Sequence, residues 1–405
     1  MKIAIVAPTE IPARRANTLQ VMKMAQAFSA EGHEVRLAAP SPRRPPSPSA
    51  LPGADEGYSS TANLVWEDLA RHYGLRHPFA VEWLYSNPRL RRYDYGWRAV
   101  SWARRWQAGL LYTRLPQAAA ISSALGFPTI LEVHDLPCGT AGSWIFRKVL
   151  QGKGARRLVA ITQALAADLS DRFGRDFSPP FTLIAPDGVD LERYQRLPGP
   201  EQARRSLALA SISGPLVNLD PDRFTVGYTG HLYPGRGGNL LLELAKRLPE
   251  ISFLIVGGEP RQVEAMQSDA DYHSLKNLLL TGFVPNADLP LYQAACDVLL
   301  MPYQEKVEAS SGGDISRYLS PMKLFEYLAC ERAIVSSDLA VLQEVLNHEN
   351  AVLLPPGSLQ AWVDTIRDLE SNPGLRLKLA KRACQDAARY TWEARAEKIL
   401  AGLSL

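Results

Sequence analysis

Two stretches of this chain show the same order of strand, loop, helix and strand, and this repetition constrains the fold most. In the first, an apolar strand at residues 2–7 leads through a polar loop and a helix to a second strand, Glu34–Ala39. The second stretch repeats the order at Phe224–Gly230, His231–Gly238, Asn239–Leu248 and Ile251–Val256. Strands joined through a helix lie parallel in one sheet, so both stretches predict Rossmann-like α/β units.

The length of 405 residues exceeds what one ordinary hydrophobic core holds, so we assign the two units to two domains. A stretch with several prolines at residues 195–222 separates them. The predicted fold class is α/β, with two Rossmann-like domains whose parallel sheets face a central cleft. Such a cleft is the usual place for a ligand.

The overall composition narrows the class of protein. The net charge of +3 is too small to indicate nucleic-acid binding, and no apolar run approaches the ~18 residues that cross a bilayer. The first residues are too short in their apolar part for a signal peptide. The four cysteines lie far apart, as expected of reduced thiols in a cytoplasmic protein. We therefore expect a cytoplasmic protein without a nucleic-acid partner.

The clearest candidate site lies on a short apolar helix that is predicted to begin with Ser320 as N-cap and Pro321 as first residue. A helix that opens out of the Gly- and Ser-rich loop 310–313 offers free N–H groups to a diphosphate, and Lys323 adds a full charge. Glu326, one turn deeper, is placed to accept two ribose hydroxyls. The alternative is that Lys323 and Glu326 form a surface pair worth a few tenths of a kcal/mol.

The run Ser-Pro-Met-Lys-Leu-Phe-Glu-Tyr-Leu-Ala from Ser320 resembles the second half of the acid-x7-acid signature of retaining glycosyltransferases of family 4, which have the GT-B fold. In that family the second acid holds the ribose of a nucleotide-sugar, and it matches Glu326. The first acid is usually assigned to hydroxyls of the donor sugar. It falls on Tyr318, so the chain departs from the pattern there. Similar stretches occur in the family's order along most of the chain, most densely at residues 224–345.

The resemblance implies a donor site in the C-terminal half. His231 takes the place of the family's arginine and Arg236 that of its lysine, so Arg236 and Lys323 are expected to bind the diphosphate. An unperturbed histidine titrates near ~6.5, which makes His231 the weaker cation at neutral pH. The expected donor-binding residues, including the backbone that holds the base, are Gly230, His231, Arg236, Phe283, Val284, Tyr318, Ser320, Pro321, Met322, Lys323 and Glu326.

His134 directly follows a predicted strand at Thr129–Val133, and residues at the carboxyl end of a parallel strand point into the ligand crevice. Taken alone, such a histidine has a structural role as its alternative. The resemblance places it beside the donor sugar or the acceptor. His134 and Glu326 are therefore the two expected catalytic residues.

The loop after the first strand holds Arg14, Arg15, Asn17 and Thr18, which we expect to bind the acceptor, because such loops face the ligand crevice. Many family members carry a Gly-Gly there, and this chain does not. The alternative is a solvated loop with a helix cap at Asn17 or Thr18.

Residues 89–106 combine arginines with aromatic residues. Arginines outnumber acids in this segment and alternate with Tyr93, Tyr95, Trp97, Trp102 and Trp106. This pattern is typical of a helix on an anionic membrane surface, here the inner face, or of a groove for an acidic acceptor. The alternative is a packed helix with inward tryptophans and solvated arginines.

The resemblance implies domains at 1–195, joined by a last helix at 388–405, and at 196–387, which bind acceptor and donor respectively. The expected activity is transfer of a hexose from a UDP- or GDP-sugar to a glycan, lipid or small molecule, with retention. We expect no cofactor and no metal, because Asp220-Pro-Asp222 reads as a turn. The alternatives are a GT-B-fold nucleotide-sugar epimerase and a non-catalytic relative that binds nucleotide-sugar.

Overall fold

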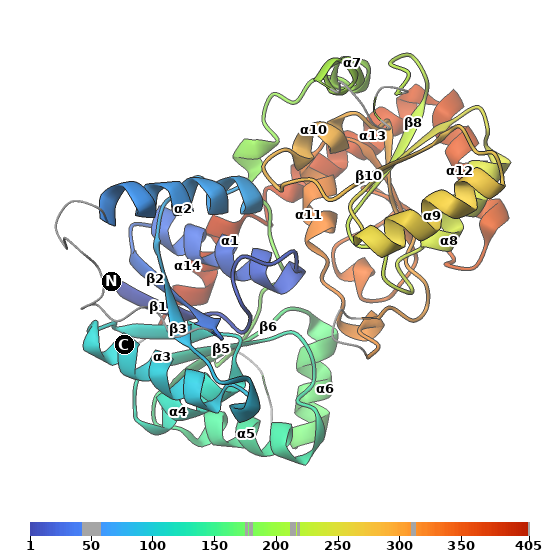
Figure 1. The fold of residues 1–405 in the computed structure, drawn as a ribbon. Coiled ribbons are helices and arrows are strands. Elements are labelled where there is room, and N and C mark those ends of the chain that lie inside the picture. Colours follow the sequence, from blue (N-terminus) through green and yellow to red (C-terminus); the bar gives the residue numbers. More distant parts are fainter. Residues whose placement is uncertain are drawn as a thin grey trace. The chain divides into compact units, whose positions relative to one another are not determined.

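The computed structural model describes residues 1–42, 58–174, 177, 181–210, 216, 219–308 and 313–403 (Figure 1). It divides into two compact units, of which unit 1 is Met1–Asp187 with Trp392–Leu405 and unit 2 is Gly188–Thr391. Each unit contains one parallel sheet flanked by helices, which confirms the predicted pair of Rossmann-like domains. The domain limits drawn from the sequence stay a prediction. Most of the predicted loop 310–313 lies outside the described residues.

Unit 1 is built on a seven-stranded sheet with the strand order β3-β2-β1-β4-β5-β6-β7. Its strands are β1 Lys2–Val6, β2 Glu34–Ser41, β3 Ala80–Tyr85, β4 Leu110–Thr113, β5 Thr129–Val133, β6 Ala155–Ala160 and β7 Thr182–Ile184. Its helices are α1 Ala16–Ala30, α2 Tyr58–Tyr73, α3 Tyr93–Arg105, α4 Pro116–Ala124, α5 Gly139–Gln151, α6 Gln163–Phe173 and α14 Trp392–Leu400. Figure 1 shows α1 and α14 on one face of this sheet and α3, α4 and α5 on the other.

Unit 2 repeats the plan with the strand order β10-β9-β8-β11-β12-β13. Its strands are β8 Thr225–Thr229, β9 Ser252–Val256, β10 Leu278–Gly282, β11 Val298–Met301, β12 Ala333–Ser337 and β13 Val352–Leu354. Its helices are α7 Pro200–Ala210, α8 Gly238–Arg247, α9 Pro260–Tyr272, α10 Leu289–Ala294, α11 Met322–Ala329, α12 Leu359–Ser371 and α13 Pro373–Ala387. All pairings between these strands are parallel.

The sheet of unit 2 is buried on both faces, which explains why its strands read as unbroken apolar runs. Successive residues of β9 alternate between two cores: Leu254 and Val256 belong to one, Phe253 and Ile255 to the other.

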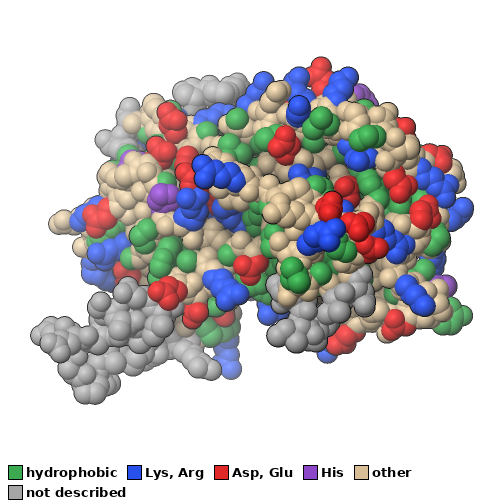
Figure 2. All heavy atoms as spheres, turned by 90° about the horizontal axis from the view of Figure 1, so that it is seen from above, with side chains coloured by type: hydrophobic (Ala, Val, Ile, Leu, Met, Phe, Trp, Pro, Cys, Tyr) green, Lys and Arg blue, Asp and Glu red, His purple; other side chains and the backbone are tan. Residues whose placement is uncertain are grey.

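Along the face drawn in Figure 2, acidic and basic side chains are interspersed, with hydrophobic side chains in small groups between them.

Two predicted helix starts differ from the structure. Helix α11 begins at Met322, and Pro321 is its N-cap with extended backbone, so Ser320 does not cap it. Helix α1 begins at Ala16 with Arg15 as N-cap, which places Asn17 and Thr18 inside the first turn. Neither N-cap residue forms a side-chain cap hydrogen bond. The sequence pattern locates helix ends less precisely than it locates the helices themselves.

The C-terminal helix α14 returns to unit 1 and packs against α1. Arg157 on β6 fixes its end, because its guanidinium donates to the carbonyl of Ile399 at 2.5 Å and to that of Ala401 at 2.9 Å. The last helix is thus part of the same fold as the N-terminal residues.

Candidate functional site

The candidate donor site lies where the sheet of unit 2 reverses its strand order, between β8 and β11. In open α/β sheets, ligands bind at the carboxyl ends of the strands at this switch point. Gly230 directly follows β8 and has a φ of +132°. A Cβ there would lie 2.9 Å from Nζ of Lys323, which comes from the first turn of α11. Only glycine suits both this backbone and this close approach.

Lys323 is a buried basic side chain whose amine forms no ion pair with the described residues. Its Nζ lies 3.7 Å from the centre of the Tyr228 ring and has no hydrogen-bond partner among the described residues. Burial, and then the nearby Arg236, hold the pKa of Lys323 well below its usual value, while Glu326 opposes them. Burying a charged ammonium group without a hydrogen-bond partner lowers the free energy of unfolding.

Arg236 is the second cation of the group. It lies in the loop between β8 and α8, and its Nε is buried without a partner in the described part of the chain. Its guanidinium also stacks near the Tyr233 ring, at 5.7 Å. Two neighbouring cations with unsatisfied donors at the switch point form a site suited to an anion.

A buried chain of hydrogen bonds through Gln293 holds one oxygen of Glu326 in place. Its Oε2 accepts from Nε2 of Gln293 at 3.1 Å, and the same amide nitrogen donates to Oγ1 of Thr229 at 3.2 Å. Tyr194 completes the chain by donating its hydroxyl to Oε1 of Gln293 at 2.9 Å. Within the described residues, Oε1 of Glu326 makes no hydrogen bond. One carboxylate oxygen is therefore fixed and the other is available to a ligand hydroxyl.

The remaining predicted donor residues lie along the same edge of unit 2. His231 stacks on Tyr233 with ring centres 4.8 Å apart, and its Nδ1 is 3.8 Å from a Glu259 carboxylate oxygen. Phe283 and Val284 follow β10 and are half-buried. Tyr318, in place of the first signature acid, is buried with 7% exposure. Ser320, Pro321 and Met322 form the entry to α11.

In unit 1, His134 directly follows β5, and its Nε2 lies 2.5 Å from Oε1 of the buried Glu132. Arg395 of α14 contacts both oxygens of this carboxylate, through an ion pair at 3.0 Å and a hydrogen bond at 3.1 Å. Gln20 donates to Glu132 at 2.7 Å and accepts from Arg114 at 3.1 Å. Because a carboxylate accepts, we assign the proton of the neutral ring to Nε2, which leaves Nδ1 as the acceptor.

Burial, followed by the charges of Arg114 and Arg395, holds the pKa of His134 well below its usual value, while Asp187 opposes them. Burial also lowers the pKa of Arg114 to about 10, with Asp187 opposing and Arg395 adding to it. His134 and Arg114 line a cavity of about 410 Å³ together with Asp135 and Cys138. A neutral imidazole in this cavity can accept a proton or a hydroxyl hydrogen bond.

Glu132, His134 and Asp187 place one potential metal-ligand atom each within 4.8 Å of one another. Arg395 engages both oxygens of Glu132, and the charge of Arg114 acts on both His134 and Asp187. Two guanidinium groups disfavour a further cation. This group is better described as an ion-pair network than as a metal centre.

The four predicted acceptor residues separate into two kinds. Arg14 and Arg15 are exposed. Thr18 is fully buried, and its hydroxyl donates to the carbonyls of Ala13 and Arg15 at 2.9 and 2.7 Å. Asn17 is half-buried in the first turn of α1. Thr18 thus holds the loop in place, and the arginines are its exposed part.

Sequence reasoning missed Glu132, Arg395, Gln293 and Tyr194. A glutamate inside the apolar strand β5 was a usable signal, because a buried acid requires a partner. The partner is 263 residues away in the sequence, and no local pattern identifies it. Gln293 and Tyr194 give no sequence signal, since amides and tyrosines are common in helices and loops.

Two family models match the chain. The model of "Glycosyltransferase Family 4" matches residues 19–193, and that of "Glycosyl transferases group 1" matches residues 223–372. HepE from Anabaena, solved in complex with UDP, superimposes with a TM-score of 0.70 over 98% of both chains at 17% identity. The architecture is therefore that of the GT-B glycosyltransferases. Within that class, the chain belongs to glycosyltransferase family 4.

The curated relatives are more similar in sequence than HepE, but their matches span a smaller share of each chain. The chain is 25% identical to D-inositol 3-phosphate glycosyltransferase of Segniliparus rotundus over 69% of this chain and 62% of that protein. It is 24% identical to the enzyme of the same name from Kineococcus radiotolerans over 92% of this chain and 81% of that protein. The match thus spans less than two thirds of the Segniliparus relative.

Proposed function

We propose that the protein transfers a hexose from a nucleoside-diphosphate sugar to an acceptor with retention of configuration. The observation that carries this proposal is a pair of basic side chains at the switch point of unit 2, in which Nζ of Lys323 and Nε of Arg236 have no hydrogen-bond partner among the described residues. A diphosphate satisfies both, and the leaving diphosphate is where charge develops in glycosyl transfer. Glu326 holds the ribose through its available oxygen. His134 acts on the sugar or acceptor side.

UDP is the favoured nucleotide. HepE has been solved with UDP and also, at a TM-score of 0.68, with UDP-glucose. A glycosyl acceptor suits the glycosyltransferase names of the curated relatives. The epimerase and the non-catalytic binder stay as alternatives because Tyr318 replaces the first signature acid. An epimerase converts its donor without an acceptor, and a binder converts nothing.

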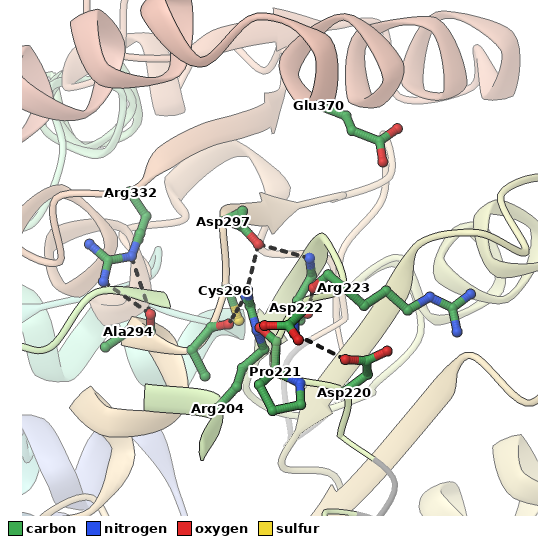
Figure 3. A network of polar contacts seen from close by, with 12 residues as sticks. Arg204, Asp220, Pro221, Asp222, Arg223, Ala294, Cys296, Asp297, Arg332 and Glu370 are labelled. Carbon is green, nitrogen blue, oxygen red and sulfur yellow. Dashed lines mark hydrogen bonds and ion pairs between the residues drawn. The ribbon is translucent and has the colours of Figure 1, made fainter. Parts of the chain in front are cut away.

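Metal independence is part of the proposal. Asp220, Pro221 and Asp222 form a turn in which the Asp222 N–H donates to Asp220 at 3.0 Å (Figure 3). Two arginines of α7 contact this turn. Arg205 pairs with Asp222 at 3.0 Å, and Arg204 donates to the Pro221 carbonyl at 2.7 Å. Asp222 is thus paired with an arginine and Asp220 accepts a backbone N–H, which makes the turn a poor metal site, and Lys323 and Arg236 supply the charge instead. Transfer in excess chelator tests this.

Glu326→Gln should weaken UDP binding by about 1–3 kcal/mol, the value of a hydrogen bond to a charged acceptor. The measurement is the UDP-dependent rise in melting temperature, extended to a panel of nucleotide-sugars. Glu264→Gln, at an exposed position on α9, is the matched control and should bind as the wild type does. Unchanged UDP affinity in a folded Glu326→Gln variant contradicts the ribose assignment.

Contact with an anionic membrane is proposed for residues 89–106. Trp102 is buried and donates to Glu82, and Trp106 stacks on it at 6.1 Å, so these two tryptophans pack inward. Leu90, Tyr93 and Trp97 are instead 46–57% exposed beside the arginines of the segment. No helix in the described part of the chain is long and apolar enough to cross a bilayer.

Trp97→Ser is expected to reduce flotation with vesicles that contain acidic phospholipid, because it removes the largest exposed apolar side chain of the segment. Tyr272→Ser on α9, also highly exposed, serves as the control. Flotation at low and high salt separates the electrostatic contribution. If flotation does not depend on acidic lipid, the segment is only a packed helix.

A further inference from the structure

A second pocket of unit 1 adjoins the His134 cavity and differs from it in charge. It has a volume of about 550 Å³ and lies at the carboxyl ends of β1 to β4, where the sheet reverses its strand order. Arg114 and Gln117 line both pockets. A group bound here would lie next to His134 within the same unit.

Arginines dominate the charge of this pocket. Arg91, Arg92 and Arg114 line it, with Glu10 as the opposing acid. Arg92 is half-buried, and among the described residues its guanidinium and that of Arg91 make no ion pair. Arg91 and Arg92 have φ values of 45° and 68°, a conformation that residues other than glycine rarely adopt. The chain holds two adjacent arginines at this pocket despite the backbone cost.

The first turns of two helices meet beside these arginines. Helix α3 begins directly after Arg92, and α4 begins at Pro116, which lines the pocket. The two helices lie side by side in Figure 1, and a Cβ on Gly96 would be only 3.2 Å from the Ala118 backbone nitrogen. Two helix N-termini add partial positive charge to the three guanidinium groups.

We propose that this pocket binds a phosphate group carried by the acceptor. Planar guanidinium groups bind phosphate oxygens in pairs, and helix N-termini are suited to the same group. The volume accommodates a phosphate with a small polyol or sugar. An acceptor anchored in this way presents its hydroxyl toward His134 in the adjoining cavity. The role of the bound phosphate rests on the proposed glycosyl transfer, whereas every residue that lines the pocket belongs to unit 1.

The test is phosphate binding in the absence of donor, with the full chain in the Lys323→Met background so that the cations of unit 2 are reduced. Glycerol 3-phosphate and glycerol are titrated by calorimetry, and vesicles of phosphatidylcholine with and without phosphatidic acid are tested by flotation. Arg92→Gln and Arg91→Gln are compared with Arg172→Gln, an exposed arginine on α6 that lines neither pocket and lies outside residues 89–106. Thermal unfolding checks that each variant is folded.

The expected result is that binding depends on the phosphate and falls about 10- to 100-fold in Arg92→Gln, the cost of one charged hydrogen-bonding group. Arg172→Gln should bind as its parent does. Binding of glycerol 3-phosphate identifies a free phosphate ester as the ligand, and binding of phosphatidic acid vesicles alone identifies a lipid headgroup. Binding of neither, or equal binding in Arg92→Gln, overturns the proposal. Because no nucleotide is used, failure of UDP binding would count against the proposed function and not against this pocket.

Discussion

Replacing Arg395 with alanine should lower the free energy of unfolding by about 3–5 kcal/mol, the cost of leaving a buried charge without its partner. The side chain of Glu132 is 0% exposed, and Arg395 binds both of its oxygens while being 4% exposed itself. Arg395 also donates to the Ala185 and Pro186 carbonyls at 3.0 and 2.8 Å. For a unit of about 200 residues, each kcal/mol lowers the melting temperature by roughly 2–4 °C.

The matched control is Arg382→Ala. Arg382 pairs with Glu349 and Asp386, but its side chain is 38% exposed, and such pairs contribute about 0–1 kcal/mol. Equal losses of stability in the two variants, measured by chemical denaturation, would contradict the account of Glu132. Adding Glu132→Gln to Arg395→Ala should recover part of the loss, because the amide needs no counter-charge.

The loss of unfolding free energy in Arg395→Ala should also depend on pH. Burial raises the pKa of Glu132, and Arg395 is the main influence that lowers it. Without Arg395 this pKa rises further, so the folded state holds a proton that the unfolded state has lost. The folded variant is then most stable at low pH and loses stability as pH rises through the raised pKa. The difference from the wild type should shrink as pH falls toward the ordinary glutamate range.

Replacing Lys323 with methionine should reduce turnover by about 100- to 1000-fold, the effect of removing one group aimed at developing charge. In the absence of nucleotide, the Lys323→Met variant should be as stable as the wild type or more stable. The reason is that the buried Lys323 amine has no hydrogen-bond partner among the described residues. A group that lowers stability and raises activity is typical of a functional site.

The control for this variant is Lys246→Met on α8. Lys246 pairs with Glu243 at 2.7 Å and is 25% exposed, so its loss should change neither activity nor UDP affinity. Melting temperatures with and without UDP complete the measurement. If Lys323→Met melts lower without nucleotide and keeps its turnover, Lys323 is a structural lysine and the diphosphate assignment is wrong.

Much of the fold follows from the sequence because its strands are buried on both faces. The predicted strand Thr129–Val133 agrees with β5, and the strand and helix after Phe224 agree with β8 and α8 within one residue at each end. Apolar runs bounded by Gly-rich loops fix such strands locally. The helix starts at Ala16 and Met322 were misplaced by one to three residues, because neither helix has the side-chain cap that the sequence pattern relied on.

The site was only partly predictable. Gly230, Lys323 and Glu326 were expected together, and the structure places Lys323 against Gly230 and one turn from Glu326. The sequence did not show that Lys323 is buried, nor that Arg395 fixes the acid beside His134. Burial and distant pairing depend on packing between elements far apart in the chain. The inward packing of Trp102 and Trp106 was one of the two alternatives for residues 89–106, and the sequence could not choose between them because periodicity does not show which helix face meets the sheet.

The most direct test of glycosyl transfer follows a radiolabelled sugar from its nucleotide donor in excess chelator, with and without acceptor. The donor is the one that stabilises the protein most, and phosphate-bearing acceptors are tried first. The account predicts that the label moves to an acceptor hydroxyl with its anomeric configuration retained, and that Glu326→Gln and Lys323→Met slow this transfer while Glu264→Gln does not. If the donor sugar is converted at the same rate without acceptor, the protein is an epimerase. Turnover that chelator abolishes and magnesium or manganese restores would contradict the diphosphate site built from Arg236 and Lys323.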